Sequence, residues 1–126
     1  METVAKMITE CAVAAVTSDT EVQRLTKGTV FAFFSKQPVQ GAFVAFENYA
    51  TNYGECKDGN YPDNFSFTVS CVDESLTVVE ALALRIEKLL NNRFFADANS
   101  ALRLMSAVTS GDGNDIICKL NFEIKL

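Results

Sequence analysis

The chain has 126 residues, of which 48% are hydrophobic and 10 are Phe, and it carries no His and a net charge of −5. A chain of this length fits one domain, residues 1–126, and its apolar content can fill a core without a metal or a disulfide. The lack of His removes the usual partner of zinc sites and of Ser or Cys nucleophiles. The acidic balance disfavours a surface that grips nucleic-acid phosphates, because such a surface needs clustered Lys and Arg.

Residues 3–16 are predicted to form an amphipathic helix. Its apolar stripe has helical spacing and consists of Val4, Met7, Ile8, Cys11 and Ala15. Charged residues interrupt this segment, so it is unlike a secretion signal, and no apolar run reaches the length of about 18 residues typical of a membrane span. We expect the protein to stay in the cytosol in which it is made and to have no membrane contact. The mostly polar residues 21–27 are predicted to be a connector.

Two strands are predicted over residues 29–34 and 41–53, which are rich in β-branched and aromatic side chains. Both strands carry apolar side chains on both faces. The first places Val30 and Phe34 opposite Phe31 and Phe33, and the second places Phe43, Ala45 and Tyr49 opposite Val44, Phe46 and Asn48. The second apolar face is either a core face under the first helix or an interface with another subunit. Phe31, Phe33 and Phe43 are therefore candidate interface residues.

Residues 52–63 contain three kinds of turn-forming residue, Gly, Pro and Asn or Asp, and are predicted to be a loop between two strands. About ten polar residues exceed the usual two to five of a hairpin connection, so we expect the loop to have a function. Tyr53 and Tyr61 are further interface candidates, because a tyrosine ring gains contact area at low entropy cost.

Residues 64–72 alternate apolar and hydroxyl side chains, which predicts a strand with one buried face. Residues 75–91 then repeat apolar side chains with helical spacing, which predicts a helix that folds back over that face, with Asp73 or Ser75 as its N-cap. Two more strands are predicted over residues 101–109 and 115–126, joined by a turn at residues 110–114. The predicted core consists of Phe67, Val69, Leu82, Ile86, Leu120 and Phe122.

The predicted order is therefore α-β-β-β-α-β-β. It describes an α+β fold in which an antiparallel sheet of about five strands carries an N-terminal helix and one main helix.

The sequence offers few groups for catalysis or for cofactor and metal binding. The acidic pairs Asp73-Glu74 and Asp112/Asp115 are explained by helix capping and by turn formation. The segment around Gly111 and Gly113 lacks the third Gly and the helix of a dinucleotide site, and residues 58–60 lack the Glu of a calcium loop. The four cysteines include no C-x-x-C pair and are expected to be reduced thiols. We expect no catalytic, cofactor or metal site and no enzymatic activity.

Three segments nevertheless form a familiar pattern: P-x-x-x-A-F-V-A-F at residues 38–46, F-S-F-T-V-S-C-V-D-E-S at 65–75 and A-L-A-L-R-I-E-K-L-L at 81–90. With the order of the elements, this pattern resembles the tail-completion or tail-terminator proteins of long-tailed bacteriophages and prophages. The resemblance covers residues 30–126 and lies in the order and pattern of the elements.

The resemblance implies a structural virion protein without catalysis, assembled in the bacterial host cytoplasm. Such proteins form a homo-oligomeric ring, commonly a hexamer, between the tail tube protein and the head–tail connector protein, and DNA passes through the ring without sequence-specific binding. An apolar surplus suits subunit contacts, and a net acidic chain suits DNA that must slide past. The alternatives are a small cytosolic protein-binding adaptor or chaperone-like domain, and an enzyme without His. Oligomeric state separates them, because a ring requires a multimer whereas an adaptor or enzyme can be a monomer or a dimer.

Overall fold

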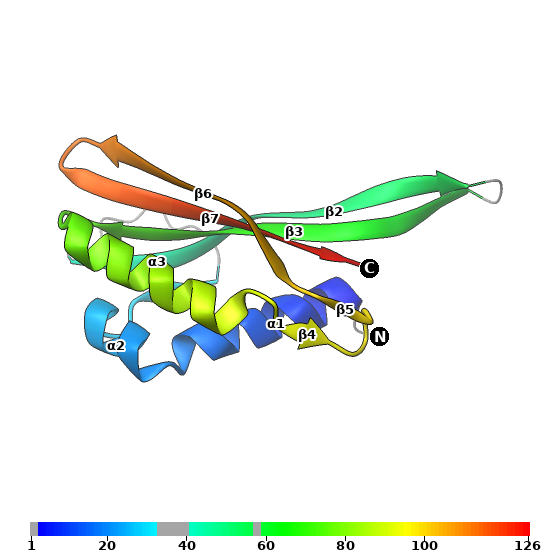
Figure 1. Cartoon of the computed structure of the whole chain (residues 1–126), viewed down its shortest axis with the longest axis horizontal. Helices are drawn as coiled ribbons and strands as arrows, with labels where there is room; N and C mark the ends of the chain where they lie inside the picture. Colours follow the sequence, from blue (N-terminus) through cyan, green and yellow to red (C-terminus); the bar gives the residue numbers. More distant parts are fainter. Residues whose placement is uncertain (1–2, 33–40, 57–58) are drawn as a thin grey trace.

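The computed structural model describes residues 3–32, 41–56 and 59–126. Within these residues, a five-stranded and mainly antiparallel sheet carries three helices on one face (Figure 1). The elements are α1 (Val4–Thr17), α2 (Thr20–Thr26), β1 (Val30–Phe31), β2 (Phe43–Cys56), β3 (Gly59–Asp73), α3 (Leu76–Leu90), β4 (Phe94–Phe95), β5 (Ser100–Ala101), β6 (Arg103–Asp112) and β7 (Asp115–Lys125). The predicted α+β class is confirmed.

The strand order in the sheet is β1-β2-β3-β7-β6. Only the short β1 runs parallel to its neighbour, β2; the other pairs of this described sheet are antiparallel. β4 and β5 form a small separate hairpin beside the end of α3. Residues 33 and 34 of the predicted first strand lie outside the described residues.

Each of the three helices begins at a side-chain cap. Thr3, Asp19 and Ser75 accept hydrogen bonds from the backbone N–H three residues later, at 3.1, 3.1 and 3.4 Å. Such caps satisfy N–H groups that have no partner within the helix. The prediction of a connector over residues 21–27 is wrong, because the Asp19 cap starts α2 there. A helix of seven residues is too short for its apolar spacing to stand out.

The predicted core is confirmed, since all six predicted side chains are buried in one cluster. Phe67 lies at its centre, with ring centroids 5.8 Å from Phe46, 6.1 Å from Tyr49, 6.0 Å from Phe65 and 5.7 Å from Phe122. These rings join three adjacent strands, β2, β3 and β7, under the helices. Aromatic contacts of this kind add to the stabilisation from burial alone.

A bulge in β2 places Tyr49 in this cluster. Glu47 pairs with Thr68 and Ala50 with Ser66, so two residues of β2, Asn48 and Tyr49, lie opposite one residue of β3. Asn48 adopts a positive φ of 56°, a conformation that Asn tolerates better than most residues. The predicted alternation, with Tyr49 on the face of Phe43, is therefore wrong beyond the bulge. Tyr49 instead shares the helix-covered face with Phe46.

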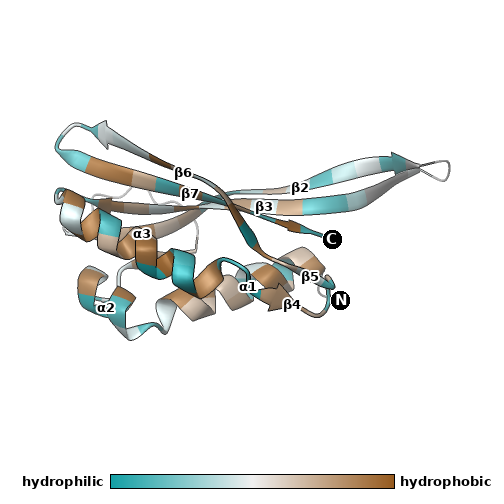
Figure 2. Ribbon diagram, in the orientation of Figure 1, coloured by the Kyte–Doolittle hydropathy of each residue, from teal (hydrophilic) through white to brown (hydrophobic). Residues whose placement is uncertain are grey.

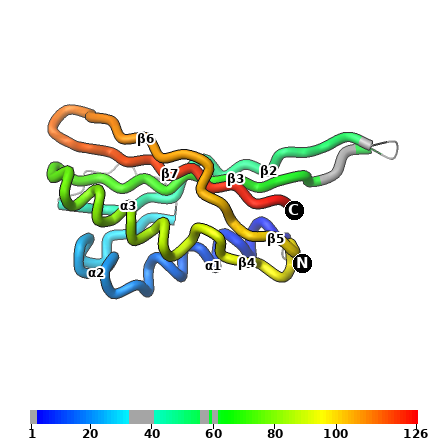
Figure 3. The backbone as a smooth tube through the Cα atoms, viewed as in Figure 1, coloured from blue at the N-terminus to red at the C-terminus, as the bar shows by residue number. Residues whose placement is uncertain are grey.

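The prediction of a loop over residues 52–63 is also wrong. β2 and β3 remain paired as far as Cys56 and Gly59, and they form a two-stranded ribbon that extends beyond the helices (Figures 1 and 3). We call the part of this ribbon from residue 50 to residue 66 the arm. Figure 2 shows polar colours along much of the arm. Phe65, at the base of the arm, is still buried in the core. Further along the arm both faces of the ribbon meet solvent, so its strands lack the apolar alternation that marks a half-buried strand.

Candidate interaction surfaces

The described residues hold no cluster of metal-binding side chains, and two of their carboxylates are held in ion pairs. They contain no group of three or more His, Cys, Asp or Glu side chains that could hold a metal ion. The pKa of Asp19 is lowered by hydrogen bonds from Arg85, and the pKa of Glu21 is lowered by those from Arg24. Both carboxylates are thus held in structural ion pairs. Within residues 3–32, 41–56 and 59–126, no helix combines the length and the apolar content needed to cross a bilayer.

Two of the predicted interface residues meet on the sheet face that the helices leave open. The rings of Phe31 and Phe43 are half-buried and form an edge-to-face pair, with centroids 5.9 Å apart and planes at 73°. Phe43 pairs with Val72 and Phe31 with Ala45, so all four side chains share this face. The idea of a second core face under the first helix is therefore wrong, because α1 packs on the opposite face. Phe33 lies outside the described residues.

The other two predicted interface residues belong to the arm. Tyr53 is 63% exposed and pairs with Pro62. The backbone of Tyr61 pairs with Gly54, and its side chain lies outside the described part of the chain. The register places both tyrosines beyond Ala50, well away from the Phe31–Phe43 pair.

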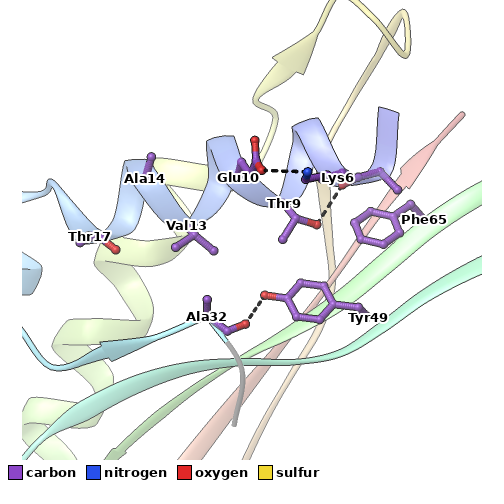
Figure 4. A pocket seen from close by; sticks show the side chains of 10 residues that line it. Lys6, Thr9, Glu10, Val13, Ala14, Thr17, Ala32, Tyr49 and Phe65 are labelled. Carbon is purple, nitrogen blue, oxygen red and sulfur yellow. Dashed lines mark hydrogen bonds and ion pairs between the residues drawn. The ribbon is translucent and has the colours of Figure 1, made fainter. Parts of the chain in front are cut away.

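An apolar groove of about 650 Å³ runs between α1 and the sheet (Figure 4). Its walls include Ala5, Thr9 and Val13 on the helix and Tyr49 and Phe65 on the sheet. The Tyr49 hydroxyl donates a 2.6 Å hydrogen bond to the carbonyl of Ala32, and burial raises the pKa of Tyr49 to about 12.

This groove was not predicted from the sequence. Its signal is a second helical stripe at spacing i, i+4, i+8, formed by Ala5, Thr9 and Val13 beside the stripe that packs into the core.

Polar side chains form a hydrogen-bonded row across the open face of the sheet. Thr68 donates to Asn121 at 2.7 Å, and Asn121 donates to Ser106 at 2.7 Å. Ser70 donates to Glu47, whose carboxylate lies 3.6 Å from the Lys119 ammonium. A second opposite-charge pair, Arg103 and Glu123, occupies directly paired positions on β6 and β7. The charges of this part of the face therefore balance.

The edge of the sheet formed by β6 is open along most of its length. β6 is the last strand of the sheet, and every residue from Met105 to Asp112 is exposed. Met105 is 61% and Val108 55% exposed, although both are large apolar side chains. The sequence indicated a strand here but could not show that it lies at the edge.

Comparison with known proteins gives a similarity of fold. Neither a protein-family profile nor the sequence of a curated protein matches the chain. Among solved structures, a chain from the "Virion of native gene transfer agent (GTA) particle" is similar, with a TM-score of 0.71. The match covers 90% of this chain and 90% of that chain at 14% sequence identity. At this identity the likeness shows that the two chains share a fold.

Proposed function

We propose that this protein is a structural component of a virion, and specifically a tail terminator or tail-completion protein at the joint between head and tail. The observation that carries the proposal is the shared fold, over nine-tenths of both chains, with a chain of a gene transfer agent virion. The pattern of sequence elements, which resembles tail-terminator proteins, supports the same role. No cluster of His, Cys, Asp or Glu that could hold a metal ion lies in the described part of the chain.

The surfaces of the molecule suit assembly. An arm that extends beyond its own helices can reach another molecule, and its exposed Tyr53 is of the residue type enriched in protein interfaces. The half-buried Phe31–Phe43 pair offers a second apolar contact. In this role the protein forms a homo-oligomeric ring, with the tail tube protein on one side and the head–tail connector protein on the other.

The charge distribution suits a ring through which DNA passes. The net charge is −5, and on the open sheet face Lys119 is paired with Glu47 while Arg103 lies in register with Glu123, so neither provides a basic track for phosphates. DNA therefore slides past without being held. The protein works in the tail of the virion after assembly in the bacterial host cytoplasm.

The experiment is to shorten the arm and to follow particle assembly. Asn52 and Asn64 are paired and their side chains hydrogen-bond at 2.6 Å, so they can close a shorter hairpin. Replacing residues 53–62 by Asn-Gly leaves a three-residue loop that ends at Asp63, a common hairpin length. Asp63 is kept because its carbonyl accepts a hydrogen bond from the N–H of Leu126 at 2.9 Å. We expect a folded protein with sharply reduced head–tail joining, as seen by electron microscopy.

The matched control is Leu84→Ala, which removes an exposed apolar side chain from α3, away from the arm and the open face. It should leave joining unchanged. Deletion of the gene should give heads without tails, and separate tails of uncontrolled length. Normal particles without the protein would refute the virion role and favour the adaptor alternative. Normal joining with the shortened arm would instead move the contact to the Phe31–Phe43 pair.

A further inference from the structure

The edge strand β6 lacks the features that usually prevent strands from pairing between molecules. Soluble proteins protect such edges with charged residues, Pro or short strands. Residues 104–111 contain no charged residue and no Pro, and they include the exposed side chains of Met105 and Val108. The one irregularity is a bulge next to Met105, at the start of the strand. An unprotected strand of this length is a template for another strand.

The arm offers an edge of similar character. On the side away from β3, β2 pairs with β1 only at Val44 and Ala45 among the described residues. Residues 50–54 carry no charge, and Tyr53 there is 63% exposed. The register on the other side of β2 is regular from Tyr53 to Cys56. Among the described residues, the sheet thus has two unprotected edges, one at each side.

The strand directions allow these two edges to pair between copies in a ring. β2, β3, β7 and β6 alternate in direction, so β2 and β6 run in opposite directions. Copies around a rotation axis keep the same orientation, so β6 of one copy meets β2 of the next in antiparallel fashion. The contact joins two different surfaces, which is the type of interface that closes rings.

The two edges are also displaced along the strands. The register places Arg103, at the start of β6, level with Glu123, Ser66 and Ala50. The arm therefore extends away from Ala50 in one direction, while β6 extends in the other, as Figure 3 shows. Pairing the arm with β6 of a copy at the same height requires strands that are tilted from the ring axis. Closed sheets have this tilt and stagger.

We propose that the arm, through residues 50–54 of β2, adds an antiparallel strand to the β6 edge of a second copy of this chain, so that the sheet continues from subunit to subunit. The proposal rests on the ring assembly of the proposed function and names the surfaces that form the ring.

The first test measures the oligomeric mass by analytical ultracentrifugation over a range of concentrations. Val108→Lys places a charge on the β6 edge and should weaken self-association about tenfold or more, because that charge is desolvated on pairing. Leu84→Lys is the matched control, since Leu84 is 60% exposed and lies on α3. It should leave the association unchanged. A wild-type protein that stays monomeric at every concentration, or equal effects of both substitutions, would overturn the proposal.

The second test fixes the partner surfaces by cysteine cross-linking in a Cys11→Ser, Cys56→Ser background. Single cysteines are placed at positions 105–110 in one protein and 50–54 in another, and the two are mixed. Antiparallel pairing predicts a specific series of cross-links. As the cysteine in β6 moves to higher residue numbers, its cross-linked partner in β2 moves to lower ones. Cross-links between two β6 cysteines would instead indicate a two-fold dimer and refute the arm as partner. If cross-linking succeeds but particles form normally without the gene, the pairing stands and the virion function fails.

Discussion

Arg85 on α3 holds Asp19 at the start of α2 with two hydrogen bonds, of 2.9 Å from Nε and 2.7 Å from a terminal nitrogen. The same carboxylate caps α2 by accepting the N–H of Val22 at 3.1 Å. The Asp19 side chain is 7% exposed, so one buried carboxylate both starts a helix and ties it to another helix 66 residues away. Two-point pairing of this kind suits the planar guanidinium of Arg, which Lys cannot imitate.

The first prediction concerns this carboxylate and pH. Arg85 lowers the pKa of Asp19 below its ordinary value of 3.8, so the ion pair stabilises the fold fully above that value and loses its effect as the pH falls through the lowered pKa. Asn at position 19 can still cap a helix, so Asp19→Asn removes mainly the charge pair. The difference in free energy of unfolding between the two proteins, measured in urea, should be largest at neutral pH and shrink below about pH 4.

Asp19→Ala removes the cap as well and should cost a further ~1 kcal/mol at neutral pH. Glu21→Gln is the control, because the Glu21–Arg24 pair lies on the surface and such pairs add little. A difference between wild type and Asp19→Asn that is the same at pH 7 and pH 3 would contradict the role given to Arg85.

The second prediction concerns the seam between α3 and the sheet. Leu82 and Ile86 are fully buried against the sheet, whereas Leu84 on the same helix is 60% exposed. Leu82→Ala or Ile86→Ala should lower the free energy of unfolding by about 2–5 kcal/mol, because each leaves a cavity. Leu84→Ala should change it by less than about 0.5 kcal/mol. Losses below about 1 kcal/mol at both buried positions would refute this packing.

The third prediction concerns the polar row on the open face. Asn121→Ala leaves the hydroxyl of Thr68, which is 5% exposed, without its 2.7 Å acceptor. The cost should be about 1–3 kcal/mol, the usual penalty for a buried polar group without a partner. Thr68→Val in the Asn121→Ala background should recover part of that loss, because it removes the stranded hydroxyl. If the loss of unfolding free energy in the double variant equalled the sum of the losses in Asn121→Ala and Thr68→Val, the two side chains would not be coupled.

The fourth prediction concerns the thiols. Cys71 and Cys118 are free, buried and directly paired across β3 and β7, and burial raises the pKa of the Cys71 thiol. In the native protein without reductant, alkylation should label the half-buried Cys11 much faster than either of them, since thiolate and access control the rate. In denaturant, mass spectrometry should find all four cysteines labelled. A disulfide in freshly isolated protein would contradict the expectation that the cysteines are reduced thiols.

Local patterns in the sequence were enough to predict the α+β class and the core around Phe67. Strand alternation and helix spacing depend on neighbouring residues, which are present in any stretch of sequence. The arm was missed for a physical reason. A ribbon with solvent on both faces needs no apolar alternation, and its Gly, Asn and Pro residues are also those of loops.

For the surfaces too, local features could be predicted from the sequence and long-range ones could not. Phe31 and Phe43 form a ring pair because β1 and β2 are adjacent, and their role as interface residues stays a prediction. The face they share was ambiguous, since it depends on which side α1 packs. The bulge at Asn48 was beyond sequence reasoning, because one inserted residue reverses every later side chain in the strand. The open edge at β6 could not be foreseen either, as strand order is set by long-range pairing.

Two of the bulges in the described part of the sheet have a mechanical consequence. Asn48–Tyr49 on β2 and Met105 on β6 both lie level with the paired residues Phe67 and Phe122. Bulges bend the strand that carries them and sharpen its local twist, and these two lie on either side of this aromatic pair. The arm continues from the bulge in β2 for the seven residues 50–56 of that strand, a lever of about 23 Å. Because a bulge also bends the strand that carries it, a change of about ten degrees in the bend at Asn48 would move the end of the arm by about 4 Å over that length, so packing changes in the core would be felt at the tip of the arm.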